Sequence, residues 1–262
     1  MVSIYLAVLI LAAAVSARAL WAQTSSSPLA FRQESNVPPQ IKQPAPDLTP
    51  EMRGDILMAR KMYREAIETY SGAGLDSAII ANKVGIAYHQ LMELDPARKN
   101  YERAIRLDPK YSEAVNNLGT IFYARKSYRK AVSYYNRALK LKPNSASIYS
   151  NLGTAQFARK KYKQALEAYD IALSLDPEVF EHRGTQGVLL QERSVEERAK
   201  FHYYLAKTYA QAGMNDRALL YIRKALEEGF TERKKLMEDP EFVALRKLPE
   251  FQQLLAMEPR VL

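Results

Sequence analysis

The side chains that most often carry out catalysis are sparse in this sequence and stand far apart. The three histidines, His89, His182 and His202, show no i,i+4 pairing, and the chain has no cysteine. There is no HExxH, GxSxG or phosphate-binding glycine loop, so the common motifs of a zinc site, a serine nucleophile and a nucleotide site are missing. The sequence therefore predicts a protein that is not an enzyme and that uses no metal and no small-molecule cofactor.

Asparagine side chains instead recur at a regular distance and could carry out a different chemistry, the binding of a peptide backbone. Asn117 and Asn151 lie 34 residues apart, and Thr120 and Thr154 are separated by the same interval. A carboxamide offers both a donor and an acceptor, which matches a backbone that has one of each. The alternative interpretation is that these asparagines only solvate an exposed helix face.

A 34-residue period positions these side chains. Within residues 112–177, Leu118-Gly119 recurs as Leu152-Gly153, Ala131 as Ala165, Tyr135 as Tyr169, Ala138 as Ala172 and Pro143 as Pro177. The order small residue, Ala, Tyr, Ala, Pro at this period resembles the tetratricopeptide-repeat (TPR) family. The resemblance implies an all-α TPR solenoid, in which each repeat is a pair of antiparallel helices stabilised by stacking on its neighbours.

The period divides the chain into about five repeats and a helical C-terminal cap. We expect repeats near residues 47–77, 78–111, 112–145, 146–179 and 199–232, an insert at 180–198, and a cap at 233–262 with short helices at 241–247 and 250–257. Thr49 before Pro50, and Ser194 three residues before Glu197, indicate helix starts. The small residues of the first helices (Gly85, Gly119, Gly153, Ala206) should face alanines of the second helices (Ala97, Ala131, Ala165, Ala218). The repeat tyrosines should contact the next repeat.

The resemblance also implies where a ligand binds. In TPR proteins the first helices line a concave groove, and residues at fixed positions of those helices face the ligand. The matching residues here are Asn82, Lys83, Ile86, His89, Glu113, Asn116, Asn117, Thr120, Tyr123, Ser150, Asn151, Thr154, Phe157, Tyr203, Tyr204 and Lys207. Because this set is mostly amide, hydroxyl and aromatic, the resemblance implies a protein or an extended peptide as the partner.

Basic residues recur at the turn between the two helices of three repeats. They are Arg60, Lys61, Arg125, Lys126, Arg159 and Lys160, with Arg129, Lys130, Lys161 and Lys163 nearby. With the net charge of +9, such a basic edge could meet an anionic lipid, lipopolysaccharide or polymer. Alternatively, these cations complement the dipole of the first helix. Nucleic acid is not expected, because repeat packing accounts for the interleaved tyrosines.

The N-terminal residues predict export. Residues 4–15 form an apolar run that is short for a membrane span, and small residues follow it at Ala17 and Ala19. We therefore expect a signal peptide at 1–22; an inner-membrane anchor over residues 4–17 and a buried helix are the alternatives. Residues 23–49, rich in proline and serine, should form a disordered linker.

Together these features predict a non-catalytic interaction scaffold of an exported bacterial TPR protein, periplasmic or secreted, that binds a peptide or protein segment in its concave groove. Two alternatives stay open. One is an envelope-associated factor that binds anionic lipid or polymer through the basic edge. The other is an accessory subunit of a catalytic partner.

Overall fold

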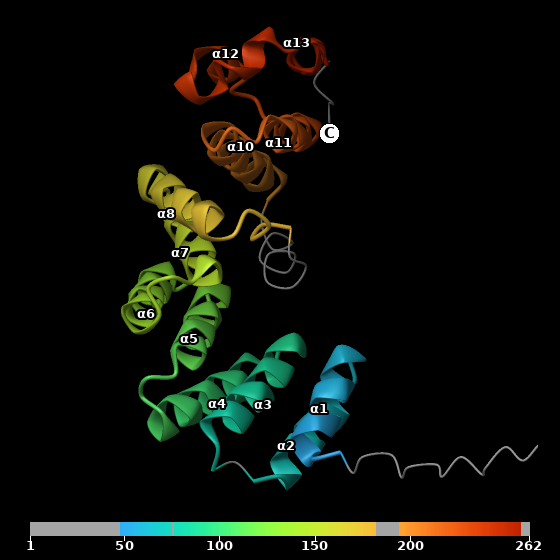
Figure 1. Ribbon diagram of the computed structural model, residues 1–262, viewed down its shortest axis with the longest axis vertical. Helices are drawn as coiled ribbons and strands as arrows, with labels where there is room; N and C mark the ends of the chain where they lie inside the picture. Colours follow the sequence, from blue (N-terminus) through green and yellow to red (C-terminus); the bar gives the residue numbers. More distant parts are fainter. Residues whose placement is uncertain (1–47, 75, 182–193, 258–262) are drawn as a thin grey trace, which may run out of the picture. The chain divides into compact units, whose positions relative to one another are not determined.

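The computed structural model describes residues 48–74, 76–181 and 194–257, and all regular structure in those ranges is helical (Figure 1). This confirms the predicted all-α fold. The elements are α1 Pro50–Ala59, α2 Tyr63–Gly72, α3 Ala78–Gln90, α4 Leu94–Leu107, α5 Ser112–Ala124, α6 Tyr128–Leu141, α7 Ala146–Ala158, α8 Tyr162–Leu175, α10 Val195–Gln211, α11 Asn215–Glu227, α12 Lys234–Glu238, the 3-10 turns η1 Pro240–Phe242 and η2 Leu245–Lys247, and α13 Pro249–Ala256. In the described ranges no helix has the length and hydropathy needed to span a membrane. The expected signal peptide, almost all of the linker, and most of the insert lie outside those ranges.

The helices pack as successive pairs: α1 with α2, α3 with α4, α5 with α6, α7 with α8, and α10 with α11. Each pair is one repeat. The first helices of neighbouring repeats also touch, since α3 contacts α5 and α5 contacts α7. We refer to α1, α3, α5, α7 and α10 as the first-helix row, because this row carries the candidate binding residues.

The predicted helix starts are confirmed. The Thr49 side chain accepts a hydrogen bond from the backbone N–H of Met52 at 3.2 Å, with Pro50 as the first helical residue. Likewise, Ser194 Oγ accepts from the backbone N–H of Glu197 at 3.1 Å. These side chains satisfy N–H groups that the first turn of a helix leaves without an intrahelical partner.

The turn between the two helices of each repeat has one conformation in all five pairs. Its central residue is left-handed, with φ between 57° and 72°: Lys61, Met92, Lys126, Lys160 and Gly213. In the third repeat the backbone N–H of Ser127 bonds the carbonyl of Phe122 at 2.8 Å, and that of Lys126 bonds Tyr123 at 2.8 Å. This is the Schellman arrangement that ends many helices. A left-handed conformation suits glycine, so the three lysines occupy positions that are unfavourable for a side chain.

The nearest groups to the glycines of the first helices are tyrosine rings, which the prediction did not include; of the predicted alanines, Ala165 also lies close to Gly153. A Cβ atom on Gly85, Gly119 or Gly153 would lie 2.4–2.7 Å from a ring carbon of Tyr101, Tyr135 or Tyr169 in the same repeat. At Gly153 the backbone oxygen of Ala165 also lies close, at 3.1 Å. A larger side chain than glycine would therefore collide with a buried ring, and the ring is what requires the glycine.

The same tyrosines also pack toward the next repeat, as predicted. Tyr101 shares a core cluster with Leu118 and Ile121 of α5. Tyr135 shares one with Ile148 and Ala155 of α7. Each tyrosine thus joins the two helices of its own repeat to the first helix of the following one.

The C-terminal cap differs in part from the prediction. In place of one helix over 241–247, the chain forms the separate turns η1 and η2, whereas α13 follows Leu248 close to the expected start. Phe242, Leu245, Phe251 and Leu254 are buried in the core cluster that contains α10 and α11.

Candidate functional site

A chain of side-chain amides runs along three consecutive first helices. Asn151 Nδ2 donates to Asn116 Oδ1 at 3.1 Å, Asn116 Nδ2 donates to Asn117 Oδ1 at 3.3 Å, and Asn117 Nδ2 donates to Asn82 Oδ1 at 3.0 Å. Asn82 Nδ2 then donates to Tyr111 Oη at 3.3 Å. The structure thus brings together four of the predicted asparagines and links α7, α5 and α3 through them.

The two ends of this amide chain are buried and its centre is not. Asn82 and Asn151 are 4% and 5% exposed, while Asn116 and Asn117 are partly exposed. A carboxamide has two N–H donors and two acceptor lone pairs. In the amide chain each central asparagine uses one N–H and one acceptor site. Asn116 and Asn117 therefore keep hydrogen-bonding capacity on a side of the helix that solvent reaches.

Ion pairs join α1 and α3, the first helices of the first and second repeats. Lys83 Nζ of α3 lies 2.7 Å from Glu51 Oε1 and 2.7 Å from Asp55 Oδ1 of α1. Tyr70 Oη donates to Asp55 Oδ1 at 2.6 Å. Burial disfavours the ammonium, but the hydrogen bonds to Asp55 and Glu51 outweigh it and raise the pKa of Lys83. The positive charge of Lys83 is therefore already neutralised within the protein.

The predicted hydroxyl groups bond within their own repeats. Thr120 Oγ1 donates to the carbonyl of Asn117 at 2.7 Å, and Thr154 Oγ1 donates to that of Ser150 at 2.9 Å. Tyr169 Oη in turn donates to Thr154 Oγ1 at 3.3 Å. Ser150, Thr120 and Thr154 are all buried, so they support the helix row rather than line an open surface.

Aromatic rings join α7 to α10. Phe157 meets Phe201 edge to face with ring centroids 5.4 Å apart, and it meets Tyr204 in the same manner at 5.7 Å. Tyr204 stacks on Tyr162 at 4.8 Å. Because Phe157 is buried, this predicted site residue acts as a packing residue between repeats.

The remaining candidates at the centre of the row are also partly or fully packed. His89 lies edge to face with Tyr101 at 6.5 Å, and burial lowers the pKa of its imidazole. Tyr123 is buried with its ring 5.2 Å from that of Tyr128. Ile86 packs against the core cluster of Tyr101. Glu113 is exposed and pairs with Lys142 at 2.7 Å.

The cap contacts two of the three candidate residues of the fifth repeat, Tyr203 and Lys207. Tyr203 Oη donates to Asp239 Oδ2. Lys207 Nζ lies 3.0 Å from the same oxygen and 3.2 Å from Glu241 Oε2, and the Lys207 side chain is 12% exposed. Tyr203 and Lys207 therefore bind carboxylates of the protein itself. Burial, then the carboxylates of Glu241 and Glu167, raise the pKa of Asp170 to about 6.

The basic residues do not form one continuous edge. The second and fifth repeats carry Leu91-Met92 and Ala212-Gly213 at the corresponding turn, so Arg60 and Lys61 stand apart from the rest. Arg125 Nη2 pairs with Asp95 Oδ1 at 2.5 Å, and Arg159 Nη1 donates to Gln156 Oε1 at 3.0 Å. Lys160 lines a cleft of about 250 Å³ with Tyr162 and Lys200. The cations are thus gathered at the third and fourth repeats.

Some residues that complete these contacts were not predicted from the sequence. Glu51 and Asp55 hold Lys83, Tyr111 accepts from Asn82, and the cap carboxylates hold Lys207. The sequence did contain a pattern that could have predicted the contact of Glu51 and Asp55 with Lys83. The two carboxylates lie four residues apart on one first helix, and the lysine lies on the next first helix. Tyr111 and the cap carboxylates lie outside the first helices, where the repeat pattern assigns no contact.

Comparison with known proteins agrees with the helix-pair architecture. Residues 85–124 and 119–159 match the TPR repeat family, and residues 146–179 match the Tetratricopeptide repeat family. Residues 85–179 are therefore tetratricopeptide repeats. Within the described ranges, no group of three or more His, Asp or Glu side chains that could hold a metal ion accompanies these TPRs.

One curated relative is the Tetratricopeptide repeat domain-containing protein PYG7, chloroplastic, of Arabidopsis thaliana, which is 30% identical over 87 residues. The match covers 30% of this chain and 29% of PYG7, so the chain spans less than a third of that relative.

Similar solved structures include a crystal structure of MamA, at 22% identity over 70% of this chain and 96% of that one, with a TM-score of 0.46. Another is YrrB, a TPR protein with an unusual peptide-binding site, at 18% identity over 76% and 91% of the two chains, with a TM-score of 0.44. A third is the second TPR domain of human RPAP3 in complex with an HSP70 peptide, at 24% identity over 41% and 92%, with a TM-score of 0.39.

Proposed function

We propose that the chain is a non-catalytic scaffold that binds an extended peptide segment of a partner protein along α3, α5 and α7. The observation that carries this proposal is the amide chain from Asn151 to Asn82, in which the central Asn116 and Asn117 keep unused donors and acceptors. Each of these two amides is held in place by its neighbours. A fixed donor–acceptor pair loses little conformational entropy when it binds a backbone, which favours affinity.

The spacing of the first helices suits an extended ligand. Packed helices lie about 8–10 Å apart, and an extended peptide advances about 3.3 Å per residue. A peptide crossing the row would therefore meet a new first helix at about every third residue. This register allows one backbone contact per repeat while the intervening side chains remain free to set specificity.

Charge contributes little to the proposed site. The two lysines of the candidate set are neutralised, Lys83 by Glu51 and Asp55 and Lys207 by the cap. Because Tyr203 and Lys207 are bound to the cap, the proposed peptide path does not include the fifth repeat. We therefore expect binding that depends on backbone hydrogen bonds and changes little with ionic strength.

The proposal can be tested with peptides selected from a random phage-displayed library against the purified chain. Synthetic versions of the enriched peptides would be titrated with the wild type and with an Asn116→Ala, Asn117→Ala variant. We expect the variant to bind about 30-fold more weakly, since it loses two hydrogen bonds and each contributes about 1 kcal/mol. The melting temperature of the variant shows whether the helix row is intact.

The matched control is an Asn136→Ala, Asn144→Ala variant, which removes two exposed amides outside the first-helix row. This control should bind the peptides like the wild type. If both variants lose affinity equally, or if no peptide is enriched, the first-helix row is not the binding surface. A strong loss of affinity in 0.5 M salt would instead indicate an ionic site elsewhere.

We further propose that the chain is exported, with residues 1–22 as a signal peptide and residues 23–49 as a tether. The apolar run at 4–15 followed by Ala17 and Ala19 supports this. Mass spectrometry of the protein recovered from cells should find an N-terminus near residue 20 or 23. An intact N-terminus on protein recovered from the cytoplasm would contradict export.

A further inference from the structure

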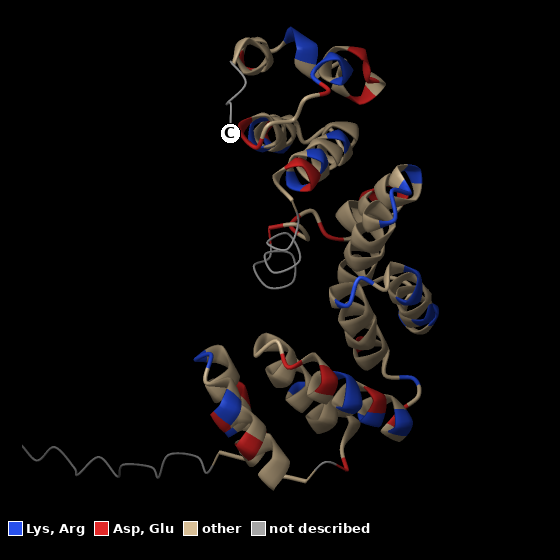
Figure 2. Ribbon diagram, turned by 180° about the vertical axis from the view of Figure 1, so that it is seen from behind, with Lys and Arg blue, Asp and Glu red and all other residues tan. Residues whose placement is uncertain are grey.

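The excess positive charge of the protein is concentrated in one part of the chain. Residues 114–166 contain eleven Lys and Arg and no Asp or Glu, whereas the other 27 Lys and Arg are matched by 29 Asp and Glu. Figure 2 shows Lys and Arg along α6 without acidic residues beside them. The net charge of the whole chain therefore originates in the third repeat and the start of the fourth.

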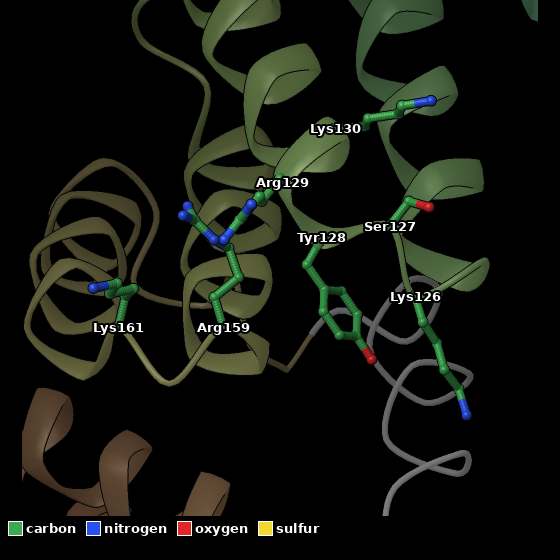
Figure 3. Close-up of a pocket in the computed structure, with 7 residues that line it drawn as sticks. All are labelled: Lys126, Ser127, Tyr128, Arg129, Lys130, Arg159 and Lys161. Carbon is green, nitrogen blue, oxygen red and sulfur yellow. The ribbon is translucent and has the colours of Figure 1, made fainter.

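Part of this charge lines a cleft of about 520 Å³ between the helix turns of those two repeats (Figure 3). Its lining consists of Lys126, Ser127, Tyr128, Arg129, Lys130, Arg159 and Lys161. Five of these seven residues are cations, and none is acidic. Figure 3 shows that Arg129 and Arg159 reach from neighbouring repeats toward the same space. We call this site the basic cleft.

The five cations of the basic cleft form no ion pair with any carboxylate in the described part of the chain. This distinguishes them from Arg125 and Lys142 of the same segment, which pair with Asp95 and Glu113. Like charges held close together repel each other. An anion bound between them would remove that repulsion, so the cleft has an electrostatic preference for a ligand of high negative charge.

One cation of the basic cleft occupies an unfavourable backbone position. Lys126 is left-handed, with φ at 57°, at a turn position that the fifth repeat fills with Gly213. A lysine here costs conformational energy that glycine would not.

We infer that the basic cleft binds a compact ligand with two or more phosphoryl groups. A phosphoryl group carries close to two charges and three acceptor oxygens in one small unit. Such a unit can be shared by the two converging guanidinium groups of Arg129 and Arg159, which bind it through paired hydrogen bonds. An acidic peptide distributes single charges along an extended chain, so it would satisfy a row of separated lysines better than one cleft.

The test uses sodium tripolyphosphate as the probe and isothermal titration of the purified full-length chain. We expect saturable binding that weakens about tenfold or more in an Arg129→Gln, Arg159→Gln variant, because charge-assisted hydrogen bonds are the strong ones. The matched control is Arg137→Gln, Lys140→Gln, which removes two exposed charges from the same helix outside the cleft. It should change affinity by about threefold or less, since distant charges are screened.

Two further ligands define the chemistry and its source. A hexaglutamate peptide should bind more weakly than tripolyphosphate. Vesicles that contain phosphatidic acid show whether a lipid headgroup can supply the phosphoryl group, and tripolyphosphate should displace the protein from any vesicles that bind it.

Four results would overturn the proposal: no binding of tripolyphosphate, equal weakening in both variants, equal affinity for hexaglutamate, or vesicle binding that tripolyphosphate does not displace. Melting temperatures verify the fold of each variant. If Arg129→Gln, Arg159→Gln were unfolded, a Lys130→Gln, Lys161→Gln variant would be judged by the same criteria. This site is independent of the proposed peptide surface, because none of its residues belongs to the amide chain.

Discussion

A single added methyl group at Gly119 tests how the repeats are packed. The Cβ atom of alanine would lie 2.7 Å and 2.9 Å from Cε1 and Cδ1 of Tyr135, where ordinary contacts begin at 3.4 Å. Tyr135 is fully buried, so its ring has little room to retreat. Gly119→Ala should therefore strain the third repeat although alanine is the better helix former.

The expected magnitude is a balance of two effects. Overpacking a buried site costs about 1–3 kcal/mol, while replacing a glycine inside a helix by alanine contributes about 1 kcal/mol of stability. We expect a net loss of about 1 kcal/mol in the free energy of unfolding. For a folded region of this size the melting temperature should fall by about 2–4 °C.

The fifth repeat supplies the compensating change. At the corresponding positions it has Ala206 and Ile222, both fully buried in one core cluster. In a Tyr135→Ile background the ring is absent, so Gly119→Ala should stabilise by about 1 kcal/mol. The two substitutions would then be coupled by about 2 kcal/mol in a double-mutant cycle.

Urea unfolding of the wild type, the two single variants and the double variant, followed by circular dichroism, measures this coupling. Gly72→Ala is the matched control, because a Cβ atom at this helical glycine meets nothing within 4 Å. It should stabilise the protein by about 0.5–1 kcal/mol. Additive effects at Gly119 and Tyr135, or a stabilising Gly119→Ala in the wild type, would refute the assigned glycine–tyrosine contact.

Three other substitutions test single interactions. Tyr169→Phe should lower the free energy of unfolding by about 0.5–1.5 kcal/mol, because it removes the hydrogen bond to Thr154 Oγ1. Tyr135→Phe, whose Oη has no partner among the described residues, should leave that free energy unchanged or raise it. Equal losses in urea titrations of the two variants would contradict this. Asp170 has its pKa raised to about 6 by burial and by Glu241. The protonated carboxyl group therefore stabilises the folded state below about pH 4, and this contribution is lost as the pH rises through 6. Asp170→Asn should raise the free energy of unfolding by about 1–2 kcal/mol at pH 7.5 and by little at pH 4. An effect of Asp170→Asn that does not change with pH would contradict the raised pKa of Asp170. Lys126→Gly should raise the melting temperature by removing a side chain from a left-handed position, and it should weaken tripolyphosphate binding. A lower melting temperature would contradict the backbone strain, and unchanged tripolyphosphate binding would contradict a role for Lys126 in the basic cleft.

The helices could be predicted from the sequence because the 34-residue period constrains them repeatedly. Thr49 and Ser194 gave reliable helix starts, since a side-chain cap depends on residues three positions away. Contacts were harder to predict, because a repeat position indicates that a residue is buried without identifying its neighbour. Gly119 was thus assigned to an alanine, although the nearest group is the ring of Tyr135.

The polar contacts of the candidate site were predicted least well. Lys83 was assigned to a ligand from its helix position alone, but its partners belong to another helix 28 and 32 residues away. Lys207 was assigned in the same way, and its partners belong to the cap, which has no repeat period. Neutralisation of a charge depends on tertiary distances, which a pattern within one helix does not contain.

The contacts between first helices also determine which repeats could be exchanged. The α1–α3 junction is ionic, the α3–α5 and α5–α7 junctions are amide to amide, and the α7–α10 junction is aromatic. With one exception, a repeat moved to another position would bring side chains of different types, ionic, amide or aromatic, together at its junctions. The third repeat has amides on both sides, so a copy of it could be inserted or removed while every junction keeps a compatible partner. The array could therefore lengthen by duplication at this point, and its amide surface would grow with it.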